Sequence, residues 1–279
     1  MSNTAWAKEQ WQDVHLGDKR TNERAVLIGQ RIAEKPSASL PAQLGSKSEL
    51  QAAYRFLNKR AVTMNALLEP HIRQTKQQVH QEPVVLWIED TTELDYTPHR
   101  NSKAGMDVIG DGKGYGLLLH STLAVVPQDR RVLGLGAVQV FRRTKREGEM
   151  KGKGWRSTPE GDCWKNSALA VGLGPEQRLW VHVGDRGADV FEFMATCVTL
   201  NKHFLVRVQQ NRRCTNEEES QLIYLKEHVR SLEAKHERAL QVNVLANKGR
   251  PARQATLTGD YPQILGTRKA LLKRGKFGL

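Results

Sequence analysis

The spacing of hydrophobic positions changes near residue 80 and divides the chain into a helical part and a part rich in strands. Before residue 77, apolar residues recur every three or four positions, which is typical of amphipathic helices. The run that follows Asp18 predicts one such helix. Its expected apolar stripe comprises Val26, Leu27, Ile28 and Ile32.

A second helix is predicted by the run SKSELQAAYRFLNK, with Ser46 or Ser48 as its N-cap. Its expected apolar stripe comprises Leu50, Ala53, Tyr54 and Leu57. Residues 36–41, which begin and end with proline, predict a loop. Arginines near the starts of such helices can bind phosphates, but a solvated helical bundle explains the same composition equally well.

The stretch VVLWIEDTTELDY at residues 84–96 begins with β-branched and aromatic residues and then reaches two carboxylates, Glu89 and Asp90. A continuous apolar run of this kind predicts a strand buried on both faces. Such a strand normally excludes charge, so we expect Asp90 at its end. Rigid scaffolds display reactive groups at such strand ends.

The stretch RLWVHVGDRGAD at residues 178–189 repeats this pattern and ends its apolar run at Gly184 and Asp185. If the two strands are neighbours in one sheet, Asp90 and Asp185 lie side by side. Repulsion between them would raise the pKa of at least one carboxyl in an empty site. A hard divalent cation removes that conflict, and oxygen ligands suit Mg²⁺ or Mn²⁺. Two such ions are the usual arrangement for in-line phosphoryl transfer.

Further runs complete an α/β pattern. LLLHSTLAVV and VLGLGAVQVF predict a hairpin, followed by a helix at 163–173, the strand before Asp185, a helix at 189–200 and the strand HFLVRVQQ. This order suggests a ribonuclease-H-like core. Beyond residue 210 we expect a polar loop (NRRCTNEEESQ), a short helix (LIYLKEHVRSL) and two strands (QVNVLAN and RQATLTG). The basic segment 142–156 predicts a mobile loop, or one ordered by a polyanion.

The charge of the chain indicates what kind of partner it binds. The formal net charge of +13 and a sequence pI near 9.8 favour a polyanionic partner such as nucleic acid, although solubility alone is an alternative. The three cysteines form no CxxC pair, and the chain has neither an apolar leader nor a run of membrane-spanning length. We therefore expect a cytoplasmic protein without a membrane partner.

Motifs spread over essentially the whole chain match one family. They are LGDKR and GSKSELQAAYRF in the helical part, IEDTTELDY around Asp90, LLLHSTL, VGDRGAD around Asp185, FLVRVQ around Arg207, and KGRPARQATL. With these motifs the chain resembles the cut-and-paste DDE transposases of bacterial insertion sequences, in the group that includes the Tn-five element.

The resemblance implies an α/β fold with a ribonuclease-H-like catalytic core and a β-rich insertion, preceded by a small all-α DNA-binding domain. Residues 1–76 would recognise transposon-end DNA. Residues 77–279 would form the catalytic domain, with the insertion from about 211. Double-stranded DNA at transposon ends is the expected partner, and either a homodimer or a mixed oligomer fits.

The resemblance also assigns roles to residues. Asp90 and Asp185 match the first two acids of the catalytic triad and would bind Mg²⁺ or Mn²⁺. DNA contacts are expected from Lys19, Arg20, Arg24, Tyr54, Arg55 and, at the active site, Arg207.

One departure affects the expected activity. The family's third acid is a glutamate in a Tyr-x-x-Arg-x-x-x-Glu signature, which this sequence lacks. We therefore expect a truncated transposase that is catalytically incomplete. The alternatives are a non-enzymatic DNA-binding inhibitor of transposition and an unrelated nuclease that completes its site from other acids.

Several of these polar residues also have simpler interpretations. Aspartate often caps a turn after a strand, so Asp90 or Asp185 alone would be better explained as structural. Both together, within these motifs, favour catalysis. Glu89 is expected to support the site or to face solvent, and Asp189 to cap the following helix. His120, inside an apolar run, predicts a core histidine with satisfied hydrogen bonds.

Overall fold

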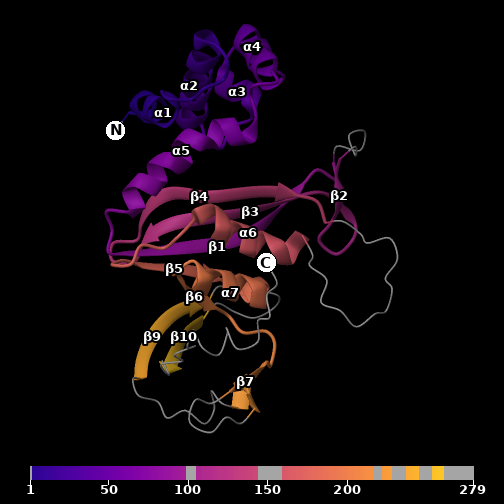
Figure 1. The fold of residues 1–279 in the computed structure, drawn as a ribbon. Coiled ribbons are helices and arrows are strands. Elements are labelled where there is room, and N and C mark those ends of the chain that lie inside the picture. Colours follow the sequence, from indigo (N-terminus) through magenta and orange to yellow (C-terminus); the bar gives the residue numbers. More distant parts are fainter. Residues whose placement is uncertain are drawn as a thin grey trace, which may run out of the picture. The chain divides into compact units, whose positions relative to one another are not determined.

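The computed structural model describes residues 2–98, 105–143, 159–215, 222–227, 237–244 and 253–260. The chain divides into two compact units, residues 1–207 and residues 208–279. The first unit holds the N-terminal helices and a six-stranded sheet, and the second holds two two-stranded sheets (Figure 1). Most of the basic segment predicted at 142–156 lies outside the described residues.

The first part of this unit is helical, as the pattern predicts. Its helices are α1 (Asn3–Trp11), α2 (Lys19–Glu34), α3 (Leu40–Leu44), α4 (Lys47–Leu57) and α5 (Met64–Val79). Asp18, Ser46 and Thr63 cap α2, α4 and α5, each by accepting a bond from the backbone N–H three residues later. Both predicted helices are confirmed, with Ser46 as the cap. The loop predicted at 36–41 is wrong at its end, because Leu40 already begins α3.

The apolar core of the helical region consists of Val14, Leu16, Ala25 and Phe56. Helix α2 approaches α1 closely at Gly29, where a Cβ atom would lie 2.1 Å from the Trp11 ring. The stripe predicted for α2 is therefore partly wrong. The helix buries Ala25 and Gly29 and leaves Ile32 40% exposed, because only small residues fit so close to Trp11.

The stripe predicted for α4 is also partly wrong. Ala53 and Phe56 are buried, whereas Tyr54 and Leu57 are 49% and 51% exposed. Residues three apart share a helix face, and the next residue along is turned by about 100°. The face that includes Ala53 and Phe56 packs inward, so Tyr54 and Leu57 turn toward solvent.

The sheet of the first unit has mixed pairing. Its strands are β1 (Val84–Asp95), β2 (Asp107–Ile109), β3 (Gly114–Val126), β4 (Arg131–Phe141), β5 (Leu179–Gly184) and β6 (His203–Val206). They follow the order β2-β3-β1-β5-β6, and β4 pairs with β3. β1 is antiparallel to β3 and parallel to β5, and β5 is parallel to β6. The strands before Asp90 and Asp185 are therefore neighbours, while the short β2 was not predicted.

Two predictions about β1 are wrong. Asp90 does not end the strand, because β3 stays paired with β1 as far as Asp95 opposite Gly116. The strand is also not buried on both faces. Val85, Trp87 and Glu89 are buried, whereas Ile88 between them is 39% exposed.

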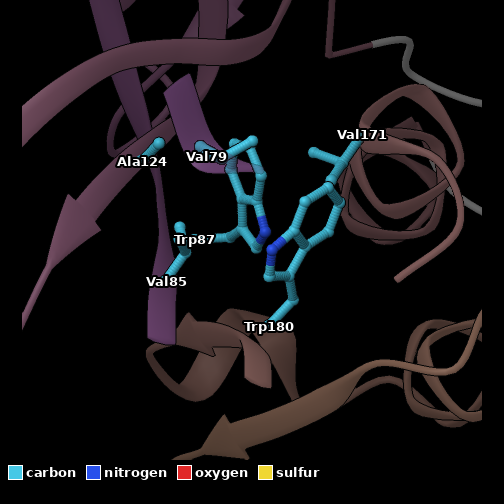
Figure 2. Packing of buried hydrophobic residues seen from close by; sticks show 6 residues of the cluster. All are labelled: Val79, Val85, Trp87, Ala124, Val171 and Trp180. Atoms are coloured by element: carbon cyan, nitrogen blue, oxygen red, sulfur yellow. The ribbon is translucent and has the colours of Figure 1, made fainter. Parts of the chain in front are cut away.

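Helices α6 (Pro159–Val171) and α7 (Phe191–Thr199) pack on the face of the sheet that holds Trp87. The rings of Trp87 and Trp180 meet edge to face with centroids 5.3 Å apart, between Val79 and Val171 (Figure 2). Both helices lie near their predicted positions. Asp189 does not cap α7, because it ends the preceding 3₁₀ turn and α7 begins after it without a side-chain cap.

The second unit holds β7 (Arg213–Thr215) with β8 (Leu222–Tyr224), and β9 (Glu237–Val244) with β10 (Arg253–Asp260). Both pairs are antiparallel, so the two strands predicted here are confirmed. The predicted polar loop is wrong at residues 213–215 and the predicted short helix is wrong at residues 222–224, where β7 and β8 pair, whereas residues 225–227 are helical as predicted. The Arg213 guanidinium lies 5.7 Å from the Tyr224 ring centroid, a contact that stabilises this pairing.

Candidate functional sites

Asp90 lies within β1, and Asp185 directly follows β5, the adjacent parallel strand. The pairing of β1 with β5 extends to Ile88 opposite Val183, and each aspartate follows two residues later. Neighbouring strands lie about 4.8 Å apart, and alternate residues share a face. Both aspartates therefore belong to the face opposite the buried Trp87, and both are exposed.

Each carboxylate accepts one local hydrogen bond. Asp90 Oδ1 accepts from the Thr91 N–H at 2.8 Å, and Asp185 Oδ1 accepts from the Gly187 N–H at 2.7 Å. Asp185 thereby caps the 3₁₀ turn Arg186–Ala188, which is its simpler structural role. A carboxylate has a second oxygen, so this cap is compatible with binding a cation.

Arg207 extends the same row onto β6. Gly184 pairs with Val206, and the Arg207 N–H donates to the Gly184 carbonyl at 3.3 Å. Arg207 therefore follows β6 at the level at which Asp185 follows β5, and it is exposed. A cationic side chain at the end of the strand next to the one before Asp185 is suited to hold the phosphate of a bound DNA strand.

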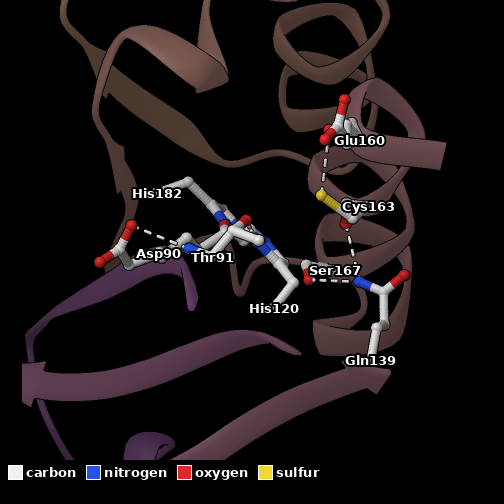
Figure 3. Close-up of polar contacts among 9 residues, drawn as sticks. Asp90, Thr91, His120, Gln139, Glu160, Cys163, Ser167 and His182 are labelled. Atoms are coloured by element: carbon white, nitrogen blue, oxygen red, sulfur yellow. Dashed lines mark hydrogen bonds and ion pairs between the residues drawn. The ribbon is translucent and has the colours of Figure 1, made fainter. Parts of the chain in front are cut away.

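On the opposite face of β1, Glu89 forms a buried network with two histidines. Its Oε2 lies 3.0 Å from His120 Nε2, and its Oε1 bonds to His182 Nδ1. The other ring nitrogen of His120 lies 2.8 Å from Thr91 Oγ1. The side chains of Glu89 and both histidines are fully buried, and Figure 3 shows the Asp90 carboxylate pointing away from this group.

The network settles two predictions. His120 is a core histidine with both ring nitrogens bonded, as predicted. Glu89 does not face solvent, because its carboxylate is enclosed beneath the helices. His182 was missed by the sequence analysis, although its place was a signal. It lies at a buried alternate position of β5, three residues before Asp185.

The hydrogen bonds to Glu89 indicate which ring nitrogen of each histidine carries the proton. When the Glu89 carboxylate accepts both bonds, His120 carries its N–H on Nε2 and His182 carries its N–H on Nδ1. His120 Nδ1 then accepts from the Thr91 hydroxyl. Burial lowers the pKa of His182, so the ring is neutral. Its Nε2 has no hydrogen-bond partner within the described part of the chain.

Two cysteines lie near this network without joining its chemistry. Cys163 and Cys197 are buried free thiols, and burial raises the pKa of each to about 12. The Cys163 thiol donates to the Glu160 carbonyl at 3.1 Å. A thiol with so high a pKa carries almost no thiolate at neutral pH, so neither cysteine is suited to act as a nucleophile.

The aspartate pair fits only a hard cation. Across the described residues, no group of three or more His, Cys, Asp or Glu side chains is arranged to hold a metal ion. Asp90 and Asp185 offer oxygen alone, which suits Mg²⁺ or Mn²⁺ that keeps several waters. These two residues are the ones that would hold such an ion.

The residues assigned to DNA contact lie on the outer faces of α2 and α4. Lys19 and Arg20 are exposed in the first turn of α2, and Arg24 lies half-buried one turn later. Tyr54 and Arg55 are exposed on α4. These side chains are open to a polyanion, apart from a weak, exposed ion pair between Lys19 and its neighbour Glu23 at 3.9 Å.

The start of α2 already carries a negative charge, which is the carboxylate of its cap Asp18. Hydrogen bonds from the Thr21 side chain and backbone, with Lys59 3.4 Å away, lower the pKa of Asp18 to about 2. The cap is therefore ionised at neutral pH and occupies the Thr21 N–H, one of the groups that a phosphate at this helix end would use. The expected DNA contact at this end of α2 would then rest mainly on the side chains of Lys19 and Arg20.

Comparison with known proteins shows a match to a family model in the N-terminal part of the chain. No helix in the described ranges is both long and apolar enough to cross a bilayer. Residues 3–62 match the family model described as transposase DNA-binding. This segment runs from α1 through α4 and includes every helical residue assigned above to DNA contact. The match supports a transposase that binds DNA, with these helices as its DNA-binding part.

Proposed function

We propose that this chain is a transposase of the DDE group, similar to the group that includes the Tn-five element. Its β1, β3, β4, β5 and β6 would form a ribonuclease-H-like core with α6 and α7. The observation that carries the proposal is the position of Asp90 and Asp185, level with each other on adjacent parallel strands. The transposase DNA-binding match at residues 3–62 supports it independently.

In this proposal Asp90 and Asp185 hold Mg²⁺ or Mn²⁺ at the exposed face of the sheet. A bound ion of this kind activates water and stabilises charge on phosphoryl oxygens. Arg207 binds the neighbouring phosphate and orients the strand. The Asp185 cap fixes its own carboxylate, because a bond of 2.7 Å from the Gly187 N–H limits rotation of the side chain.

The helical region supplies recognition. Lys19, Arg20, Arg24, Tyr54 and Arg55 contact the transposon end, and the net charge of +13 adds attraction that does not depend on sequence. A homodimer or mixed oligomer, in which two chains hold two ends, belongs to the same proposal. So does a ribonuclease-H-like domain over residues 77–279, with an insertion from about 211.

A second candidate function follows from the number of carboxylates. Two-metal phosphoryl transfer needs more than two acidic ligands, and no group of three or more His, Cys, Asp or Glu side chains among the described residues is arranged to hold a metal ion. A chain with this site would bind transposon ends and hold a cation weakly without cutting. It would then act as a DNA-binding inhibitor of transposition.

One experiment tests both candidates. The purified chain is incubated with a plasmid carrying the ends of the element that encodes it, in Mg²⁺ or Mn²⁺. We expect binding to the end sequence over a scrambled one, and no nicking. Nicking that is lost in Asp185→Ala but kept in the control Asp111→Ala would instead show a complete site within this chain. Equal binding to both sequences would remove the transposase function.

A further inference from the structure

Glu89 connects the two strands that carry Asp90 and Asp185. It lies beside Asp90 on β1, and its partner His182 lies on β5, three residues before Asp185. Its other partner, His120, lies on β3. One carboxylate therefore joins three adjacent strands on the covered face of the sheet, at the level where the exposed face carries the candidate ligands.

The same network anchors the residues that precede and follow Asp90 in the sequence. Glu89 bonds to Nε2 of His120, and Thr91 bonds to Nδ1 of the same ring at 2.8 Å. The residues before and after Asp90 are thus anchored to one imidazole. Since neighbouring residues of a strand point to opposite faces, these anchors fix the backbone of Asp90 without covering its carboxylate.

Packing keeps both imidazoles in place. The His120 ring meets Trp164 edge to face with centroids 4.6 Å apart, and the His182 ring meets Phe193 at 5.7 Å. All of these rings are buried. Neither histidine can turn away from Glu89 without opening this packing, so the hydrogen-bond geometry is rigid.

Burying this network costs free energy that an apolar core would not cost. A buried carboxylate loses its hydration, and two ring N–H donors offset that loss only in part. Well-packed apolar side chains of similar volume often give equal or greater stability. A role in geometry explains this arrangement better than a role in stability.

We propose that Glu89 is a positioning residue which, through His120 and His182, sets the separation of Asp90 and Asp185 and so their joint binding of a divalent cation. The cation part rests on the proposed function. The geometric part does not, because it concerns the distance between two residues of the chain.

A disulfide measures that distance without any metal. Cα atoms on adjacent strands lie within the range of about 4.4–6.8 Å that a disulfide bridges. Asp90→Cys and Asp185→Cys are combined in the full chain, and their equilibrium with glutathione gives the effective concentration of one thiol at the other. Glu89→Leu and Glu89→Gln are then added separately. Thr75→Val, which removes a buried hydroxyl bonded to the His71 carbonyl in α5, is the matched control.

The two Glu89 variants differ in what they can still bond. Gln offers one acceptor and one donor, so it satisfies both rings once His120 moves its proton to Nδ1 and donates it to Thr91 Oγ1, whereas Leu satisfies neither. Removing a group that orients a ligand costs about 10-fold to 100-fold. We expect Glu89→Leu to lower the effective concentration at least about 10-fold. Glu89→Gln and Thr75→Val should leave it nearly unchanged.

A milder variant covers the case in which Glu89→Leu does not fold, as judged by circular dichroism. Thr91→Val breaks the bond to His120 Nδ1, together with a contact to the Cys163 thiol, and keeps a β-branched side chain suited to a strand. Loss of one hydrogen bond of about 1 kcal/mol predicts a fall of about 5-fold in effective concentration. No fall in either folded variant would overturn the positioning role, as would failure of the cross-link to form when Glu89 is present.

Mn²⁺ titration of the chain with both aspartates intact separates the two proposals. Glu89→Leu should weaken Mn²⁺ binding by about 10-fold, with Glu89→Gln close to the original chain. If the cross-link responds to Glu89 but no variant binds Mn²⁺, the positioning role stands and the proposed cation site fails. If Mn²⁺ binds and Glu89→Leu changes neither measurement, the positioning role is wrong.

Discussion

The helical region and the central sheet place their functional side chains in opposite relations to their cores. In residues 3–62 the core is apolar, and every residue assigned to DNA contact lies on the outer side of α2 or α4. In the sheet, a buried carboxylate with two buried histidines lies one residue from the exposed Asp90. The residues proposed for binding are separate from the core residues in the first region and adjoin them in the second.

This difference predicts how each region responds to substitution. Exposed basic side chains contribute little to stability, so their removal should affect DNA binding alone. The aspartates of the sheet depend on the packing and bonding beneath them, so changes in the interior should also change the exposed site. The expected effects range from a large loss of stability in the sheet to a small pH dependence in the helices.

The largest effect should come from the interior of the sheet. Trp87→Ala removes a fully buried indole that packs against Trp180 and fits over Gly136, where a Cβ would lie 2.3 Å from the ring. We expect the free energy of unfolding in urea to fall by about 3–5 kcal/mol. The control Trp6→Ala, at a side chain 40% exposed, should cost far less. Equal losses would mean that the two regions do not differ as described.

A smaller effect, confined to binding, should come from the helices. Arg20→Ala with Arg55→Ala removes two exposed positive charges. We expect weaker binding to all DNA sequences, and a salt dependence whose slope falls by about 1 for each phosphate that the variant no longer neutralises. The melting temperature should not change. Lys113→Ala, which removes one exposed positive charge of the sheet region, is the control for loss of charge away from the helices.

Unchanged DNA affinity in the arginine double variant would place the DNA contacts elsewhere. A fall in melting temperature would also contradict the comparison, because it would show that these charges contribute to folding. Fluorescence anisotropy at several salt concentrations measures the binding, and circular dichroism measures the stability.

The smallest effect should be a pH dependence at the start of α2. The folded pKa of Asp18, about 2, lies below its ordinary value of 3.8, chiefly because Thr21 donates to it. The carboxylate therefore stabilises the fold above about pH 4, and this contribution is lost as the pH falls toward 2. The difference in melting temperature between the original chain and Asp18→Ala should narrow between about pH 4 and about pH 2. A difference independent of pH would contradict the role of the charge.

The sequence predicted the fold where periodicity and local caps determine it. The helices after Asp18 and Ser46 and the paired strands before Asp90 and Asp185 follow from patterns within single segments. It did not predict the continuation of β1 to Asp95, because that depends on the partner strand β3. Likewise, Gly29 lies at the centre of a helix contact only because Trp11 of another helix reaches it.

The sequence predicted the exposed residues of the candidate site but not the buried network beneath them. Asp90, Asp185 and Arg207 each follow an apolar run, a signal that can be read from the sequence alone. The buried half needs three strands in register before Glu89, His120 and His182 meet. A polar residue at the alternate buried position of a strand is a signal for such networks, but its partners become visible only with the sheet.

The central claim is that Asp90 and Asp185 act together on one cation, and a Mn²⁺ titration of four chains tests it most directly. The chains are the original, Asp90→Asn, Asp185→Asn and the double variant, with electron paramagnetic resonance measuring free Mn²⁺. If the pair shares an ion, we expect weak binding in the original chain. Each single variant should lose it, and the double variant should be no worse than either. Unchanged affinity in Asp90→Asn, or losses that add as for two independent sites, would contradict the claim.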